Sequence, residues 1–274
     1  MSNASLRGSV EELKKRSVDA FISELVEQSQ ESNLAKITGI MRERGVYEVF
    51  LPEGNRCGMI SARDILRTAN IENTKPAAVM SYIPSPSKDA SVGEVARLMA
   101  DYRVRAVPIS EKRKIIGQVN CLRLLQELKG KVSGDLRITS LATRNPITIE
   151  KTATVGKARE LLVKKRIDHL PVTAKGRVIG IATTGLILNY VSPPERVGSK
   201  SKKPETKRSF DLLVEDAMEP APLTCPPETS AEQALESMMK SEKTCILVTQ
   251  WEELQAIATQ RDFMTLLAEV EPEP

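Results

Sequence analysis

The sequence contains few of the residues from which metal sites and catalytic motifs are built. It has one histidine, His169, and four widely separated cysteines that form no C-x-x-C pair: Cys57, Cys121, Cys225 and Cys245. This scarcity disfavours a zinc site or a disulfide framework and predicts that the cysteines are small buried side chains. No G-x-S-x-G or similar motif supplies a nucleophile with its base, so an enzyme is disfavoured.

Long apolar runs are also missing. No run approaches the roughly 18 residues that a membrane helix needs, and the N-terminal stretch lacks the apolar core of a signal peptide. We therefore expect a cytoplasmic protein without membrane contact. Aromatic residues make up only 3% of the chain, whereas 41% of residues are hydrophobic and 28% charged. That balance is typical of a soluble globular protein.

One pattern occurs four times along the chain, at residues 32–52, 90–110, 153–173 and 229–249. Each copy begins with a capping residue (Asn33, Ser91, Thr154 or Ser230) and continues with apolar residues at helical spacing. Each copy ends in a β-rich run: YEVFL, AVPI, HLPV or CILV. The pattern predicts a helix followed by a strand in every copy.

A second motif follows each copy, where a second strand and a second helix are expected. Its four versions are GMISARDIL (58–66), GQVNCLRLL (117–125), GIATTGLIL (180–188) and AIATQRDFM (256–264). The last two versions are farther apart because the polar segment 193–209 lies between them. The Pro, Ser and Lys content of this segment predicts a linker or an exposed loop.

The Pro-containing strands AVPI and HLPV, the Gly-led motif and the spacing together resemble the cystathionine-β-synthase (CBS) domain. The resemblance implies an α/β (α+β) fold of four CBS repeats of β-α-β-β-α type, which pair through their sheets into two Bateman modules. We expect an N-terminal extension at 1–16, a first module at 17–130 and a second at 134–270, which contains the insert 193–209.

The repeated motif has the chemistry of a nucleotide site. Ser61 and Thr259 lie where a strand ends and a helix begins, and free backbone N–H groups at such a junction attract anions. Asp64 and Asp262 follow in the first helical turn, where a carboxylate can accept hydrogen bonds from the two hydroxyls of a ribose. The resemblance implies the same roles. The alternative is a capping box, which needs no ligand.

The second and third copies depart from this motif. Asn120 and Arg123 replace the hydroxyl and the carboxylate in the second copy, and Leu186 replaces the carboxylate after Thr183 in the third. Neither Arg123 nor Leu186 can accept a hydrogen bond from a diol. The alternatives for Arg123 are a solvated surface position and contact with a phosphate held by its partner repeat.

Four further basic residues are candidates for ligand contact. Arg63 and Arg261 precede the two carboxylates, where they stabilise the carboxylate, reach a phosphate or remain solvated. Arg105 and His169 precede or begin the Pro-containing strands, and the resemblance implies that a basic side chain there points into the cleft between paired repeats.

The leading hypothesis is a non-catalytic regulatory protein that senses adenine nucleotides. AMP, ADP, ATP and S-adenosylmethionine all fit a diol site with an apolar cleft, and the nucleotide is a regulatory ligand rather than a catalytic cofactor. Because four repeats use up the chain, the ligand state would act on a protein partner or through self-association as a homodimer.

The alternative is an RNA- or ribosome-associated protein. The insert 193–209 has six basic residues against two acidic ones, a net charge of +4 that equals the formal charge of the whole chain. Its basic residues are Arg196, Lys200, Lys202, Lys203, Lys207 and Arg208. A solvated loop explains the segment equally simply. With so few aromatic residues, RNA contact would depend on phosphates rather than on base stacking.

Overall fold

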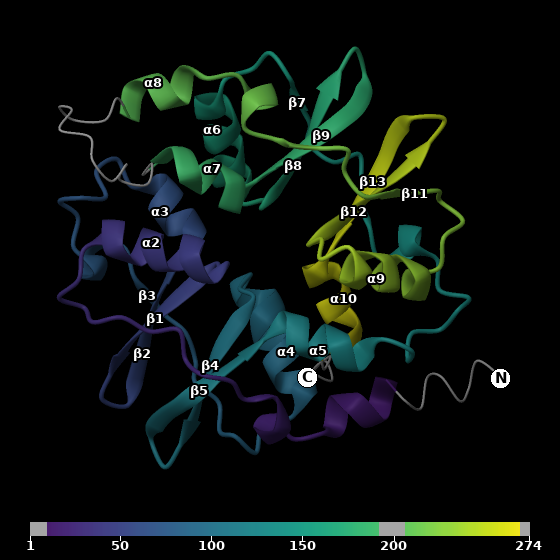
Figure 1. The fold of residues 1–274 in the computed structure, drawn as a ribbon. Coiled ribbons are helices and arrows are strands. Elements are labelled where there is room, and N and C mark those ends of the chain that lie inside the picture. Colours follow the sequence, from purple (N-terminus) through teal and green to yellow (C-terminus); the bar gives the residue numbers. More distant parts are fainter. Residues whose placement is uncertain (1–9, 192–205, 269–274) are drawn as a thin grey trace.

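The computed structural model describes residues 10–191 and 206–268 of the 274-residue chain. Within these ranges, one order of elements occurs four times: a helix, two antiparallel strands and a second helix (Figure 1). We call these four segments the first to fourth units. The predicted α/β fold class is confirmed.

The first helix of each unit begins after the capping residue that the sequence predicts. Asn33, Ser91, Thr154 and Ser230 each accept a hydrogen bond from the backbone N–H three residues on. These bonds satisfy N–H groups that have no partner inside a helix. The four helices are α2 (Leu34–Arg44), α4 (Val92–Tyr102), α6 (Val155–Lys165) and α9 (Ala231–Lys240).

Each first helix leads into a two-stranded hairpin and then a second helix. The hairpins are β1 (Glu48–Glu53) with β2 (Arg56–Ser61), β4 (Ala106–Glu111) with β5 (Lys114–Asn120), β8 (His169–Ala174) with β9 (Arg177–Thr183), and β12 (Cys245–Gln250) with β13 (Glu253–Thr259). The second helices are α3 (Ala62–Arg67), α5 (Cys121–Leu128), α7 (Thr184–Val191) and α10 (Gln260–Leu267).

Short strands tie the units together in pairs. β3 (Ser81–Tyr82), which precedes the second unit, pairs with β2 of the first, and a bridge joins Ser23 to Gln118 of the second. β10 (Glu219–Pro220) pairs with β9 of the third unit, and β6 (Thr143–Arg144) pairs with β13 of the fourth. The first and second units therefore exchange chain segments, as do the third and fourth.

The remaining short elements recur in equivalent places. β7 (Ile149–Glu150) and β11 (Thr224–Cys225) extend the hairpins of the third and fourth units in parallel. Short 3-10 turns precede the exchanged segments or the units: η1 (Val18–Phe21), η2 (Pro76–Ala78), η3 (Ile138–Ser140) and η4 (Val214–Asp216).

The glycines that open the motif in the second and third units are required by this exchange, whereas Ala256 takes that place in the fourth unit. A Cβ at Gly117 would lie 2.5 Å from the carbonyl oxygen of Ser23, and one at Gly180 would lie 2.8 Å from that of Glu219. Real Cβ atoms do not approach a backbone oxygen so closely, so a side chain would push the exchanged segment away. In these two units the motif glycine thus reflects backbone packing between units.

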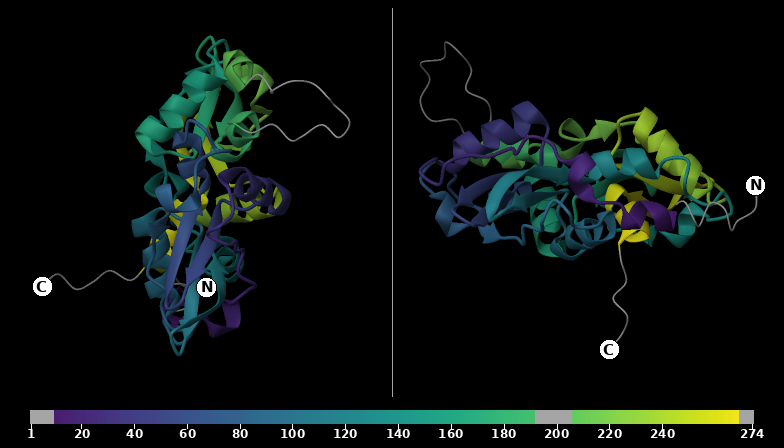
Figure 2. Two further views of the ribbon diagram at one scale, coloured as in Figure 1. Left: turned by 90° about the vertical axis from the view of Figure 1, so that its left-hand side faces the viewer. Right: turned by 90° about the horizontal axis from the view of Figure 1, so that it is seen from below.

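Helices join the pairs into a ring. α3 packs against α6 and α7, which links the first and third units, and α10 packs against α4 and α5, which links the second and fourth. Two hydrophobic clusters follow these contacts: one includes Ile65 and Ile187, the other Leu124 and Phe263. The four units surround a common centre in Figure 1, and the views in Figure 2 show a flattened body.

Two segments differ from their expected roles. Residues 10–15, inside the expected extension 1–16, are helical, and Leu13 is buried in the core cluster of the second and fourth units. The core therefore extends beyond the expected boundary at residue 17. Residues 193–205 of the insert lie outside the described part of the chain. A helix, α8 (Thr206–Asp211), begins within the last four residues of the insert.

Candidate functional site

In the first and fourth units the repeated motif forms a capping box. Asp64 Oδ2 accepts hydrogen bonds from the Ser61 backbone N–H at 2.9 Å and hydroxyl at 2.6 Å. Asp262 Oδ2 accepts the same pair from Thr259, at 2.6 and 2.8 Å. The capping alternative is therefore present in the structure. Because both bonds in each box go to Oδ2, capping alone occupies only one of the two carboxylate oxygens.

The other two motifs cap their helices without a carboxylate. Asn120 accepts the backbone N–H of Arg123 at 3.0 Å, and the Thr183 hydroxyl accepts that of Leu186 at 3.2 Å. Arg123 is exposed and Leu186 is half-buried. The sequence departures at these positions thus preserve the helix start while removing the diol acceptor.

In each unit one residue lies immediately before the first strand of the hairpin, and these four residues occupy equivalent positions. In each unit, the residue two positions after the left-handed turn accepts a backbone hydrogen bond from the first residue of the second helix. The acceptors are Tyr47, Arg105, Asp168 and Thr244, at 2.7, 2.7, 3.0 and 3.1 Å respectively. We call these four residues the central ring. They differ in charge although their backbone geometry is the same.

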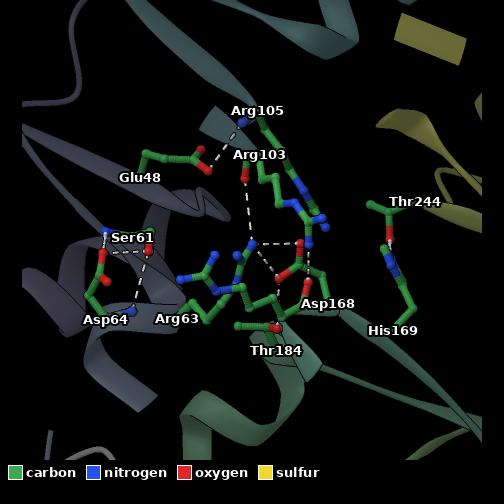
Figure 3. Close-up of polar contacts among 11 residues, drawn as sticks. Glu48, Ser61, Arg63, Asp64, Arg103, Arg105, Asp168, His169, Thr184 and Thr244 are labelled. Atoms are coloured by element: carbon green, nitrogen blue, oxygen red, sulfur yellow. Dashed lines mark hydrogen bonds and ion pairs between the residues drawn. The ribbon is translucent and has the colours of Figure 1, made fainter. Parts of the chain in front are cut away.

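Asp168 is the acidic member of the central ring, and it is bound on two sides. Both of its oxygens lie 3.2 Å from Nη2 of Arg63 of the first unit, and Oδ1 accepts the Thr184 hydroxyl at 3.1 Å (Figure 3). Burial acts to raise the pKa of Asp168, but Arg105 and Arg63 hold it below its ordinary value. Asp168 is therefore ionised.

Arg63 points away from its sequence neighbour Asp64 and toward Asp168 (Figure 3). Its side chain is only 13% exposed, and its Nε is buried without a hydrogen-bond partner among the described residues. A buried N–H without a partner is uncommon in folded proteins. Arg63 therefore retains one unused donor next to the centre of the ring.

Arg105 is enclosed by groups from two other units. Its guanidinium lies 3.5 Å from the centroid of the Tyr47 ring, which favours the cation by a cation–π contact. Burial alone would lower the pKa of Arg105, but Tyr47, Asp168 and Glu48 raise it above its ordinary value. Arg105 is thus a fixed positive charge between the first and third units.

His169 is buried rather than available as a cation. Its Nε2 lies 2.7 Å from the Thr244 hydroxyl of the fourth unit (Figure 3). Burial, with the positive charge of Arg105, lowers the pKa of His169 to about 3. A neutral imidazole can hydrogen-bond a ligand, but it brings no charge to a phosphate.

A cavity of about 90 Å³ lies beside the motif of the fourth unit, and five of the sequence-predicted residues line it. Thr259, Arg261 and Asp262 come from the fourth unit, Arg105 from the second and His169 from the third. We call this space the Asp262 cavity. Its other lining residues include the cation Arg103, the anion Asp168 and the apolar side chains Val104, Ile167, Ile257 and Met264.

A larger cavity, of about 330 Å³, lies beside the motif of the third unit. Thr183 and Leu186 line it, together with Tyr47 and the ion pair between Lys243 and Glu219. The larger volume and the complete motif therefore occur in different places. The motif is the better guide to nucleotide chemistry, because Leu186 supplies no acceptor for a ribose.

The predicted residues of the first unit are arranged differently. Ser61 and Asp64 line neither of these two cavities, and Arg63 is engaged by Asp168. The sequence pattern predicts that Arg105 and His169 occupy equivalent positions. In the structure, Arg105 is instead equivalent to Asp168, one residue before His169. Aligning RVRAVP with RIDHLP would have found Asp168. Nothing in the sequence indicated Glu48, whose carboxylate is buried beside Arg105.

All four cysteines are buried, as predicted, and burial raises the pKa of Cys57, Cys121 and Cys245 to about 12. Within residues 10–191 and 206–268, no group of His, Cys, Asp or Glu side chains could hold a metal ion. No helix in that part of the chain is long and apolar enough to cross a membrane.

The basic insert is mostly beyond structural description. Arg196, Lys200, Lys202 and Lys203 lie outside the described residues. The backbone of Lys207 and Arg208 belongs to α8, but their side chains are likewise outside the described part.

The chain belongs to the CBS domain family. The family matches residues 78–130, 138–193 and 214–269, which together make up more than half of the chain. These stretches contain the helices and hairpins of the second, third and fourth units, and the first unit lies outside them.

Relatives include the uncharacterized protein MJ1404 of Methanocaldococcus jannaschii, 24% identical over 92% of this chain and 62% of that protein. Inosine-5'-monophosphate dehydrogenase of Korarchaeum cryptofilum is 30% identical over 39% of this chain and 22% of the enzyme. The chain therefore spans less than two thirds of either relative.

The crystal structure of protein MJ1225 from M. jannaschii, suggested to be an archaeal homologue of g-AMPK, has a similar fold. It matches with a TM-score of 0.80 at 16% identity, over 92% of this chain and 100% of that one. At this identity the likeness concerns the fold.

Proposed function

We propose that this protein is a non-catalytic regulator that binds adenine nucleotides and transmits their presence to a partner. The observation that carries the proposal is the convergence of Thr259, Asp262, Arg261, Arg105 and His169 on one cavity, although they come from three units. The motif alone predicts a helix cap. The added cations and apolar walls are what a nucleotide requires and a cap does not.

The lining residues divide by chemistry. Asp262 has a carboxylate oxygen beyond the one used in capping, and it would accept the ribose hydroxyls. The N-terminus of α10, with Thr259 and Arg261, would bind phosphate. Val104, Ile257 and Met264 would enclose the adenine.

The volume of the Asp262 cavity makes binding and shape change inseparable. Ligand pockets usually enclose about 300–1,000 Å³, whereas this cavity encloses about 90 Å³. A nucleotide would have to widen the space between the second, third and fourth units. Such a difference between free and bound states is what a regulator needs, because a ligand shifts only an equilibrium between states that it binds unequally.

We further propose two modules, at residues 17–130 and 134–270, with the helix at 10–15 packed onto their shared core. The exchange of short strands between the first and second units, and between the third and fourth, supports this division. Each module has one complete motif, Ser61 with Asp64 or Thr259 with Asp262. We therefore expect two nucleotides to bind per chain, and Asp64→Ala combined with Asp262→Ala to abolish binding.

The test compares two capping boxes. Asp262→Ala removes a cap and the proposed ribose acceptor, whereas Gln233→Ala removes only a cap, because Gln233 closes the equivalent box with Ser230 in α9. With AMP, ADP or ATP at a hundred times the dissociation constant, each bound ligand should stabilise the folded protein by about 2.7 kcal/mol. In Asp262→Ala the stabilisation by ligand should be smaller by the contribution of one ligand, and in Gln233→Ala it should be unchanged. An unchanged shift in Asp262→Ala would leave only the capping role.

The charge of the insert favours a second candidate function, RNA or ribosome association. If four to six of its cations meet phosphates, log K should fall with log salt at a slope of about −3 to −5. Exchanging Lys200, Lys202, Lys203, Lys207 and Arg208 for Ser or Gln should abolish co-sedimentation with ribosomes or RNA and leave nucleotide binding intact. If the unmodified protein does not associate at low salt, the insert is a solvated loop.

A further inference from the structure

The central ring brings one negative charge to a place rich in arginine. Tyr47, Arg105, Asp168 and Thr244 occupy the same backbone position in the four units, and only Asp168 is anionic. Asp168 lines the Asp262 cavity, so a ligand phosphate that approaches Arg105 or Arg261 also approaches this carboxylate.

We propose that Asp168 is a specificity-determining residue, which makes the Asp262 cavity favour adenosine ligands with few phosphates over ATP. The inference rests on the proposed function, since it concerns the ligand of the same cavity. In this proposal the Asp168 carboxylate limits how much negative charge the cavity accepts.

The charges that line the cavity set this limit. The lining holds Arg103, Arg105 and Arg261 with Asp168 and Asp262, and His169 is neutral, so the lining side chains carry a net charge of +1, or +2 when Arg63, which pairs with Asp168, is included. One terminal phosphate, with a charge of about −1.5 to −2, already balances most or all of it. Each further phosphate adds negative charge that has no cation to meet in the cavity and is repelled by Asp168.

Asp168 is held so that it cannot move away from an incoming anion. Arg63 contacts both carboxylate oxygens at 3.2 Å, and the Thr184 hydroxyl donates to Oδ1 at 3.1 Å. These bonds come from the first and third units, so they also fix the carboxylate between two parts of the ring (Figure 3). The repulsion is therefore built into the folded chain.

The test is Asp168→Asn in the full chain, with AMP and ATP as probes and calorimetry as the measurement. The amide keeps an oxygen that can accept from Thr184 and Arg63 but removes the charge. The ratio of the ATP dissociation constant to that of AMP should fall by about tenfold or more, because ATP carries more charge near the exchanged group. Glu215→Gln is the matched control, since it removes an equal charge from an ion pair with Lys151 that does not line the cavity.

A second variant guards against misfolding. Asp168→Asn leaves the buried Arg63 without its ion pair, so Arg63→Gln with Asp168→Asn removes both members; because Asp168 lines the cavity and Arg63 does not, the ratio should still fall, but by less than in Asp168→Asn. If AMP and ATP bind but the ratio is unchanged in both variants, or changes equally in Glu215→Gln, this inference is wrong and the proposed function stands. If neither nucleotide binds the unmodified chain or any variant, the proposed function fails and this inference fails with it.

Discussion

Glu48 accepts a hydrogen bond from the backbone N–H of Arg105, with its Oε1 3.1 Å from the nitrogen. The bond joins the first strand of the first unit to the central ring position of the second. Because Glu48 is only 6% exposed, its charge is poorly solvated, and burial raises its pKa to about 7. A carboxyl group that contacts the central ring therefore titrates near neutral pH.

Glu48 should make the protein less stable as the pH rises from about 4.5 to about 7. In this window the folded state holds a proton that the unfolded state has released, so the free energy of unfolding falls, by roughly 3 kcal/mol. Glu48→Gln keeps an oxygen for Arg105 and should match the unmodified protein at pH 4 but exceed its stability at pH 8. Urea unfolding across this range measures the difference, and parallel curves for the two proteins would contradict it.

His169 should have the opposite pH dependence. Its pKa falls from an ordinary 6.5 to about 3 in the folded state, so between these values only the unfolded state binds the proton. The free energy of unfolding is therefore highest above pH 6.5, and it falls by several kcal/mol as the pH falls toward 3. His169→Gln, which can still bond Thr244, should flatten this acid limb. An acid limb of unchanged slope would show that other groups cause it.

Leu13 should behave as a core residue although it lies in the expected N-terminal extension. It is 1% exposed and belongs to the cluster of the second and fourth units. Leu13→Ala should lower the free energy of unfolding by about 2–5 kcal/mol, as large-to-small changes in cores do. Leu122→Ala, at a position that is 45% exposed, is the control and should have little effect. Equal effects of the two changes would place residues 10–15 outside the cooperative core.

The local structure was predictable because its causes are local. The caps Asn33, Ser91, Thr154 and Ser230, the apolar spacing after them and the β-rich runs predict each helix and strand from neighbouring residues, and the structure has them. The capping boxes at Asp64 and Asp262 were also foreseen, as the alternative to a ligand site.

The ring and its charges were not predictable in the same way. Arg63 and Asp168 are 105 residues apart, and their contact depends on how α3 packs against the third unit. The burial of Glu48 and His169, and hence their shifted pKa values, follows from the same long-range packing. The fourfold recurrence of the pattern in the sequence indicates that units repeat but carries no information on which units meet.

The third unit offers the sharpest test of the motif, because its cavity has the volume and lacks the carboxylate. The cavity of about 330 Å³ falls within the usual range of ligand pockets, and Thr183 already caps the Leu186 backbone N–H at 3.2 Å. Leu186→Asp should complete the motif there and raise the number of AMP molecules bound per chain from two to three, as measured by calorimetry.

The control for this change is Asn189→Asp, which adds the same charge to the same helix and the same cavity but outside the first helical turn. It should leave the stoichiometry at two, because its carboxylate would lie away from Thr183 and from the N-terminus of the helix. A folded Leu186→Asp protein that still binds two would show that the carboxylate is insufficient. Three ligands on the unmodified chain would show that it is unnecessary.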